Sequence, residues 1–140
     1  MPYAKRRLYT YNATDMSKNA LQEAKRAISK LQETIYWKPG KDIQHLEKRR
    51  VLGDLPQDRQ IEDYNKLINE LVQGLENEVY LYEFGSQRYY MITGKIKEKE
   101  WVVIFSTEGI IETAFPPQDT EEYLNKRNTA LLGKVGEIVK

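Results

Sequence analysis

The sequence predicts an α+β fold in which amino-terminal helices pack on a four-stranded antiparallel meander sheet, with a short carboxy-terminal helix after it. The second half holds four runs rich in β-branched and aromatic residues, which are typical of strands. Short gaps with glycine or charged residues separate them, so consecutive strands pair most economically as a meander. The runs are residues 78–84, 88–93, 101–106 and 110–116. Earlier segments repeat apolar residues every three or four positions, as helices do.

Length and composition predict one domain. The chain has 140 residues, of which 40% are hydrophobic, and this is enough apolar material for one core. No apolar run approaches the roughly 18 residues of a membrane span, so we expect no membrane association and a cytoplasmic location. The chain has no cysteine and one histidine, so we expect no metal and no cofactor. The expected domain, 1–140, comprises an arm (1–13), a helical part (14–75), a sheet (78–117) and a short helix with a tail (118–140).

Charge is distributed unevenly along the chain. The net charge is +1, yet residues 1–52 hold 12 Lys/Arg and 5 Asp/Glu, while the remainder holds 10 and 16. A basic surface of this kind attracts nucleic acid or an acidic partner protein, although ordinary solvated helix faces give the same count. In the arm, the basic cluster Lys5, Arg6 and Arg7 lies among tyrosines. It either contacts a nucleic-acid backbone or belongs to an arm that packs its tyrosines down.

The first helix is expected from Thr14 or Asp15, either of which can cap it, through Trp37. Its apolar stripe consists of Leu21, Ala24, Ile28, Leu31 and Ile35. The Pro39-Gly40 pair ends the helix.

Residues 42–52 form the segment with the most chemical potential. If Asp42 caps a short helix, then His45, Lys48 and Arg49 gather on one side of it. Neighbouring cations lower the pKa of an imidazole and favour its neutral, basic form. Phosphodiester cleavage needs such a base together with cations that stabilise the phosphate. The alternative is an ordinary surface histidine on a basic helix.

The helix over 61–74 is interpreted as scaffold, and the strands and the last helix follow it. A second amphipathic helix over 61–74 has an acidic outer side. In the last strand, strict alternation places Ile111, Thr113 and Phe115 on the same face. The two prolines at 116 and 117 end the sheet, a helix follows over 120–126, and the tail from residue 128 is expected to be loose.

This succession of elements resembles a known group of enzymes. A basic helix with a histidine precedes a Tyr/Leu-rich helix and strands that contain Tyr89-Tyr90-Met91, Trp101-Val-Val-Ile-Phe105 and the string Thr113-Ala114-Phe115-Pro116. The pattern, over about residues 42–124, is similar to the metal-independent ribonuclease domains of the barnase, EndoU, colicin and RelE (BECR) group. Its phage-associated and colicin-D-like branches look most similar.

The resemblance implies roles for particular residues. His45 would be the acid or base, with Lys48 and Arg49 as cations at the phosphate and Thr113 as a hydroxyl on the catalytic face. Arg88 would join them if its strand directs it to the same cleft. Several members of the group carry a second histidine, where this chain has arginine. Because arginine cannot act as a base at neutral pH, a lysine or tyrosine would take the second proton role, or activity has been lost.

Two functions therefore stay open at this point. The first is an endoribonuclease, such as a toxin or mobile-element nuclease, that cuts RNA through attack of the 2′-hydroxyl. It would have RNA and an inhibitor or immunity protein as partners. The second is a non-catalytic α+β module that binds nucleic acid or an acidic protein through its basic half. A purely structural protein is a third, weaker interpretation.

Overall fold

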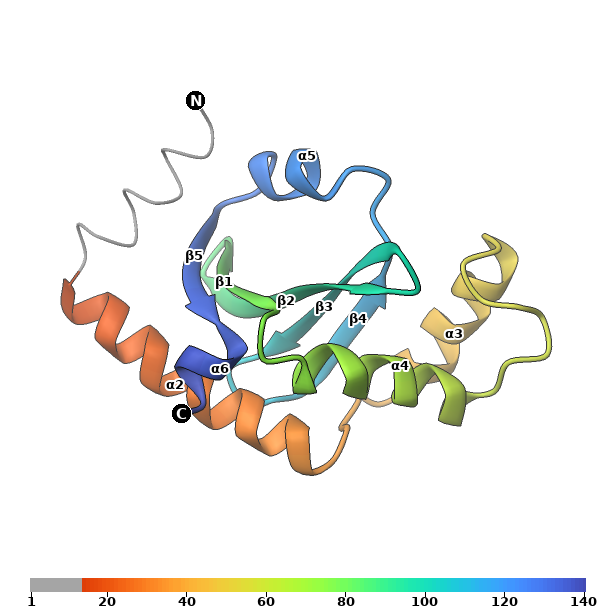
Figure 1. The fold of residues 1–140 in the computed structure, drawn as a ribbon, viewed down its shortest axis with the longest axis horizontal. Coiled ribbons are helices and arrows are strands. Elements are labelled where there is room, and N and C mark those ends of the chain that lie inside the picture. Colours follow the sequence, from red (N-terminus) through yellow and green to blue (C-terminus); the bar gives the residue numbers. More distant parts are fainter. Residues whose placement is uncertain (1–13) are drawn as a thin grey trace.

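The computed structural model describes residues 14–140, with side chains from Asn19 onward. It is an α+β fold built on one antiparallel sheet with strand order β4-β3-β2-β1-β5 (Figure 1). The helices are α2 (Thr14–Glu33), α3 (Lys41–Val51), α4 (Ile61–Gln73), α5 (Thr120–Asn125) and α6 (Val135–Ile138). The strands are β1 (Glu78–Phe84), β2 (Gln87–Ile96), β3 (Lys99–Ser106), β4 (Ile111–Phe115) and β5 (Thr129–Lys134). The predicted fold class and the meander of β1 to β4 are confirmed.

The predicted number of four strands is wrong, because the tail forms a fifth. Strand β5 pairs antiparallel with β1, for example Leu81 with Ala130, and α6 follows it. Thr129 and Ala130 are buried, so this short apolar run completes the sheet instead of hanging loose. Its signal is weak in the sequence because Gly133 interrupts it. That glycine has φ 144° and lies where a bulge shifts the β1–β5 register.

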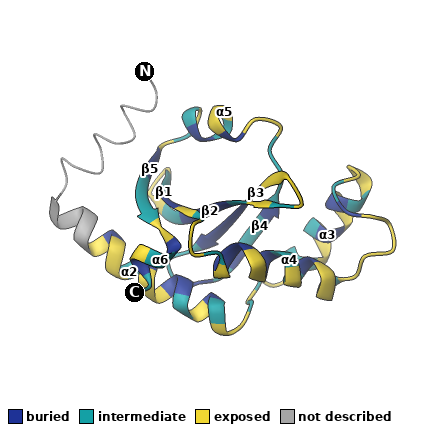
Figure 2. Cartoon of the chain, viewed as in Figure 1, coloured by how far each residue is buried: buried dark blue, intermediate teal, exposed yellow. Residues whose placement is uncertain are grey.

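The main core lies between the sheet and the helices α2 and α4. Helix α4 packs on β2 and β3, and α2 packs against α4 and α6. Figure 2 shows buried residues along β2 and β3 and exposed ones on the outer side of α4. The largest fully buried side chains of this core are Ile28, Leu31, Tyr64, Ile68, Leu71, Tyr90, Ile92, Phe105 and Ile111. Burial of this apolar area drives folding and fixes the helices relative to the sheet.

The other face of the sheet carries a smaller, more aromatic cluster. Helix α5 packs on β3 from this side and contributes Leu124 (Figure 1). Around it lie Tyr80, Met91, Val102 and Ile104, with Tyr82, Tyr89, Phe115, Tyr123 and Leu131 at the margin. Asp119 caps α5 by accepting a hydrogen bond from Glu122 N at 3.1 Å. The sheet is therefore covered on both faces.

The first helix is shorter than its periodicity suggests. Helix α2 ends at Glu33, whereas we expected it to continue through Trp37. The next residues are β-branched or aromatic and extend along β4 instead. Ile111 N donates to Tyr36 O at 2.7 Å, and Lys38 N donates to Ile111 O at 3.0 Å. Trp37 is thus placed beside the last strand of the meander, in an isolated parallel bridge.

A bulge in β4 corrects the predicted facing of its side chains. Ile104 pairs with Thr113 but Phe105 pairs with Ile111, so Glu112 is an extra residue in the ladder. Ile111 therefore belongs to the helix-side core, whereas Phe115 belongs to the opposite cluster. Strict alternation had placed both of them and Thr113 on one face.

Some of the predictions concern residues that the structure does not describe. Lys5, Arg6 and Arg7 lie outside the described residues, as do the side chains of the predicted caps Thr14 and Asp15. Within residues 14–140, no helix is long and apolar enough to cross a membrane.

Candidate active site

Helix α3 lies along β4 and brings two of its side chains to that strand. His45 Nδ1 is 3.1 Å from Thr113 Oγ1, and the Arg49 guanidinium lies 5.7 Å from the centre of the Phe115 ring. Four residues of helix span about 6 Å and two residues of strand about 6.8 Å, so the helix and the strand match in register. The structure therefore brings together His45 and Thr113, as the resemblance implies.

The start of α3 depends on a turn that only glycine adopts readily. Gly40 is the N-cap residue with φ 82°, in the left-handed region, and Lys41 N donates to Lys38 O at 3.0 Å. Asp42 is not the cap residue that we expected, because it lies in the first turn. Its carboxylate accepts a hydrogen bond from Ile43 N at 2.8 Å. The Pro39-Gly40 turn thus directs α3 back along β4.

The imidazole ring of His45 also stacks on the ring of Trp37. The two rings stack with centroids 6.2 Å apart and an interplanar angle of 22°. Trp37 is fixed in turn, because its Nε1 donates to Asn65 Oδ1 at 2.7 Å and its ring packs on Tyr64 at 5.3 Å. The Tyr64 hydroxyl donates to the carbonyl of Ala114. Sequence reasoning missed Trp37, although the strand-like run 34–37 was the available signal.

The surroundings of His45 keep its imidazole neutral near pH 7. Its pKa lies below the ordinary value of 6.5, first because the ring is partly buried and then because Lys41, Arg49 and Lys48 are near. Among the described residues Nε2 has no hydrogen-bond partner. When Nδ1–H donates to Thr113 Oγ1, the lone pair on Nε2 is available as a base.

The two neighbouring cations of α3 have different environments. The Lys48 side chain is exposed and makes no ion pair or hydrogen bond within residues 19–140. The Arg49 side chain is only 6% exposed and pairs with Asp54 at 2.8 Å, while its buried Nε has no partner. A phosphate would have to displace Asp54 to reach Arg49. We therefore assign Arg49 to the support of the helix rather than to direct contact with a substrate.

Arg88, the other predicted substrate-binding residue, lies elsewhere. Its guanidinium pairs with Glu23 of α2 at 2.8 Å, and the same carboxylate accepts from the Tyr90 hydroxyl at 2.6 Å. Arg88 and Tyr90 are two positions apart in β2, so both side chains lie on its helix-side face. Strand β3 lies between β2 and β4. The structure does not bring Arg88 to His45.

Charges near the candidate site are otherwise few. Lys38 pairs with Glu112 at 3.8 Å, with 53% of the lysine side chain exposed. Lys41 has no ion pair or hydrogen bond from its side chain to any described residue. In residues 19–140, whose side chains the structure describes, no three His, Asp or Glu side chains are grouped to hold a metal ion. Two hollows border the β2–β3 hairpin, and the residues that line them do not include His45 or Thr113.

Comparisons with protein families, curated proteins and solved structures found no match to this chain. The arguments for a function therefore rest on the residue pattern and on the geometry around His45.

Proposed function

We propose that the protein is a metal-independent endoribonuclease with His45 as its general base. The observation that supports this most directly is the 3.1 Å contact between His45 and Thr113, which are 68 positions apart in the sequence. It joins the only histidine of the chain to the hydroxyl that the BECR resemblance assigns to the catalytic face. The lowered pKa of His45 supports a base that is ready at neutral pH.

In the proposed reaction, Nε2 of His45 takes the proton of an RNA 2′-hydroxyl. The 2′-oxygen forms a bond to the adjacent phosphorus as the bond from phosphorus to the 5′-oxygen breaks, leaving a 2′,3′-cyclic phosphate. Thr113 holds the imidazole in orientation through Nδ1. Lys41 and Lys48, both near His45 and without a partner among the described residues, would stabilise negative charge on the phosphate.

The departing 5′-oxygen also needs a proton. A second histidine could give it in other members of the resembled group, but this chain has none. The ammonium group of Lys41 or Lys48 is our candidate donor. Afterwards the His45 imidazolium releases its proton to the solvent and the lysine regains one from it, so that both groups are restored and no net proton is consumed. A toxin or mobile-element nuclease of this kind would have an inhibitor or immunity protein as its partner.

The decisive test is cleavage of a labelled RNA in excess EDTA. We expect His45→Ala to lower the cleavage rate by roughly 10²- to 10⁴-fold, the usual scale for losing a general acid or base. The matched control is Gln44→Ala, an exposed neighbour on the same helix, which should cleave as the wild type does. Equal rates for wild type and His45→Ala at matched thermal stability would remove His45 from the mechanism.

A non-catalytic module that binds RNA or an acidic protein is the second candidate. The unpartnered ammonium groups of Lys41 and Lys48 favour a binding module as much as they favour a ribonuclease. It predicts no cleavage, but RNA binding that weakens steeply between about 50 and 200 mM salt. Removing the charges of Lys5, Arg6 and Arg7 should flatten that salt dependence.

A further inference from the structure

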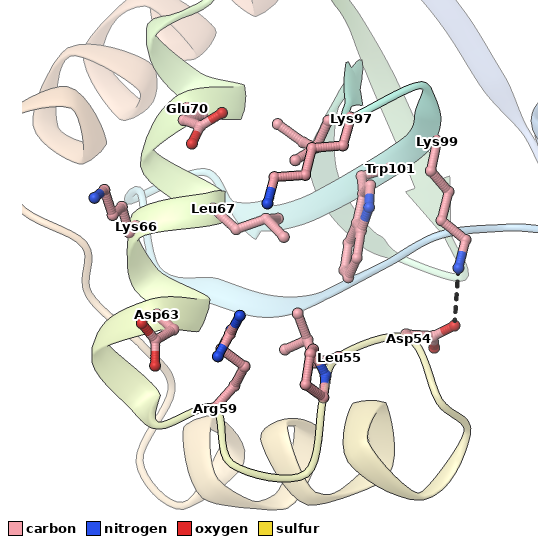
Figure 3. A pocket seen from close by; sticks show the side chains of 12 residues that line it. Asp54, Leu55, Arg59, Asp63, Lys66, Leu67, Glu70, Lys97, Lys99 and Trp101 are labelled. Atoms are coloured by element: carbon pink, nitrogen blue, oxygen red, sulfur yellow. Dashed lines mark ion pairs between the residues drawn. The ribbon is translucent and has the colours of Figure 1, made fainter.

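A hollow of about 550 Å³ lies between α4, the α3–α4 loop and the β2–β3 hairpin (Figure 3). Its volume is within the roughly 300–1,000 Å³ of small-molecule sites. The apolar part of its wall consists of Leu55, Pro56, Leu67, Ile96 and Trp101. The loop delivers Leu55, the helix Leu67 and the sheet Trp101, so the wall is fixed by three separate elements.

The charged residues that line the hollow include one more cation than carboxylates. Of the three carboxylates, Asp54 is held by Arg49 at 2.8 Å and by Lys99 at 3.7 Å. Asp63 accepts a hydrogen bond from Gln60 N at 2.8 Å, at the start of α4. Only Glu70 has no hydrogen bond or ion pair from its carboxylate to the described residues.

Four cations and three carboxylates line the hollow, and once the Asp54–Lys99 pair is set aside, three cations face the two carboxylates of Asp63 and Glu70. Lys66 and Lys97 have no side-chain partner among the described residues. Arg59 pairs at 3.1 Å with Asp58, and 79% of that aspartate side chain is exposed. An exposed pair of this kind is weak and opens readily. Figure 3 shows Arg59 and Lys97 directed into the hollow from opposite sides. An anion between them would meet positive charge from the loop and from the hairpin.

The hairpin holds Lys97 there at a cost in backbone energy. Lys97 has φ 50° and Glu98 has φ 69°, so both central residues of the turn are left-handed. Such turns strongly prefer Asn-Gly. A strained backbone at a pocket rim is a pointer to function when it delivers a useful side chain. Here the two strained residues deliver opposite charges to opposite sides, because Glu98 lines the second hollow.

That second hollow, of about 640 Å³, differs from the first in the charge of its lining. Its lining carries two lysines against five carboxylates, namely Lys95, Lys99, Asp54, Glu98, Glu100, Asp119 and Glu121. An anion would be repelled there. The hairpin therefore separates a cation-rimmed apolar hollow from an acidic one.

We propose that the hollow in Figure 3 binds a nucleoside phosphate. The flat base packs on the apolar wall at Leu55 and Leu67, and the phosphate lies between Arg59 and Lys97. Two sources share this chemistry, a free nucleotide and the terminal nucleotide of an RNA. The site is separate from His45 and does not depend on cleavage.

The chain contains two tryptophans, so two indole N–H signals report on the two sites in an ¹⁵N NMR spectrum. The protein used is the 140-residue chain with His45→Ala, which keeps RNA probes intact. The additional change Trp37→Phe assigns the two signals. Adenosine 5′-monophosphate at millimolar concentration is expected to shift the Trp101 signal saturably and to leave that of Trp37 in place. Adenosine and inorganic phosphate should bind more weakly when added separately.

A 2′-O-methyl RNA tetramer with a 5′-phosphate distinguishes the two sources. Tighter binding than the mononucleotide at Trp101 identifies the RNA end, and equal or weaker binding identifies the free nucleotide. No saturable shift of the Trp101 signal with either probe would overturn the proposal. Loss of cleavage in His45→Ala tests the other site, so failure of one proposal leaves the other standing.

Substitutions in the turn between β2 and β3 give the most specific test of the proposed site. Lys97→Asn with Glu98→Gly installs the preferred turn residues, so the melting temperature should rise while nucleotide affinity falls by about tenfold, the scale of one charge-assisted hydrogen bond. Lys95→Gln is the matched control, since that lysine of the same hairpin lines only the acidic hollow. Its affinity should equal that of the wild type. An equal loss in both variants, or none in either, would refute binding at this rim.

Discussion

Two clusters of charged residues beside the sheet show how differently the same residue types can be used. Between α2 and β2, the Arg88 guanidinium and the Tyr90 hydroxyl share the carboxylate of Glu23. Beside β4, His45 lies near two lysines that have no carboxylate partner among the described residues. The first cluster is satisfied internally. In the second, charge remains available to a ligand, and this is why we place the candidate active site there.

The titratable groups of the two clusters respond to burial in opposite directions. Burial and the nearby Glu23 raise the pKa of Tyr90, so its hydroxyl stays protonated and donates to the carboxylate. Burial and nearby cations lower the pKa of His45, so its imidazole stays neutral and can accept a proton. Both groups are uncharged near pH 7, yet only the imidazole is a base in that state.

The largest expected effect comes from turning a matched charge into an unmatched one. Asp54→Ala leaves the buried guanidinium of Arg49 without its carboxylate and should lower the free energy of unfolding by about 3 kcal/mol. Urea denaturation measures this. Asp58→Ala is the control, because its pair with Arg59 is exposed and should change stability by less than about 1 kcal/mol. Equal losses in the two variants would mean that burial of the Arg49–Asp54 pair does not set its importance.

The next effect concerns the unmatched lysines. If the proposed ribonuclease reaction occurs, changing Lys41 and Lys48 together to glutamine should slow RNA cleavage by about 10²-fold, because charge on the phosphate loses its stabilisation. Arg88→Met removes one cation from the satisfied cluster instead, and its cleavage rate should equal that of the wild type. Single-turnover assays at low salt compare the three proteins. A similar slowing in Arg88→Met would indicate a general charge effect rather than a local one.

If the proposed reaction occurs, a smaller effect is expected from Thr113, whose hydroxyl lies 3.1 Å from His45 Nδ1. Thr113→Val keeps the shape of the side chain but cannot bond to Nδ1, so cleavage should fall by about tenfold, the scale of one hydrogen bond. Thr113→Ser keeps the hydroxyl and should recover most of the rate. If serine and valine slow cleavage alike, then packing against β4, and not the hydrogen bond, is what matters at this position.

Part of the fold could be predicted from the sequence, because the signals for those elements lie in residues close together in the chain. The four meander strands and helices α3 and α4 follow from apolar spacing and from turn residues close in the chain. Strand β5 was missed because its run is short and carries Gly133, so that only pairing with β1 makes it a strand. The end of α2 was missed because residues 34–37 satisfy a helical period but gain hydrogen bonds from β4.

For the candidate site, the sequence predicted which residues lie together but not which cations are paired. His45 and Thr113 were singled out together, and their proximity is present in the structure, while their roles stay predictions. The pairing of Arg88 could not be read, since its partner Glu23 lies 65 positions earlier in the chain. The pairing of Arg49 depends on the turn after α3, which returns Asp54 to the helix. Whether a cation is free is thus a tertiary property, invisible to composition.

The smallest expected effect is a dependence of stability on pH that belongs to His45. Its pKa in the folded protein lies below the ordinary 6.5, so the unfolded chain binds a proton more readily than the folded one. The folded state therefore has its full stability from this group above about pH 6.5 and loses part of it as pH falls through that value toward the folded pKa. Denaturation at about pH 8 and about pH 5 should show a larger loss in wild type than in His45→Gln.

If the proposed ribonuclease reaction occurs, the same pKa predicts where cleavage should fail at acid pH. A base that stays neutral below pH 6.5 keeps the rate constant until the pH approaches its lowered pKa. Removing the charge of Lys41 or Lys48 should raise the pKa of His45, so the acid limb of the rate profile should move to higher pH. Arg88→Met should leave that limb in place, because its charge is balanced by Glu23 in the other cluster. An acid limb that moves equally in all three variants would show that long-range charge, and not the neighbours on α3, sets the pKa of His45.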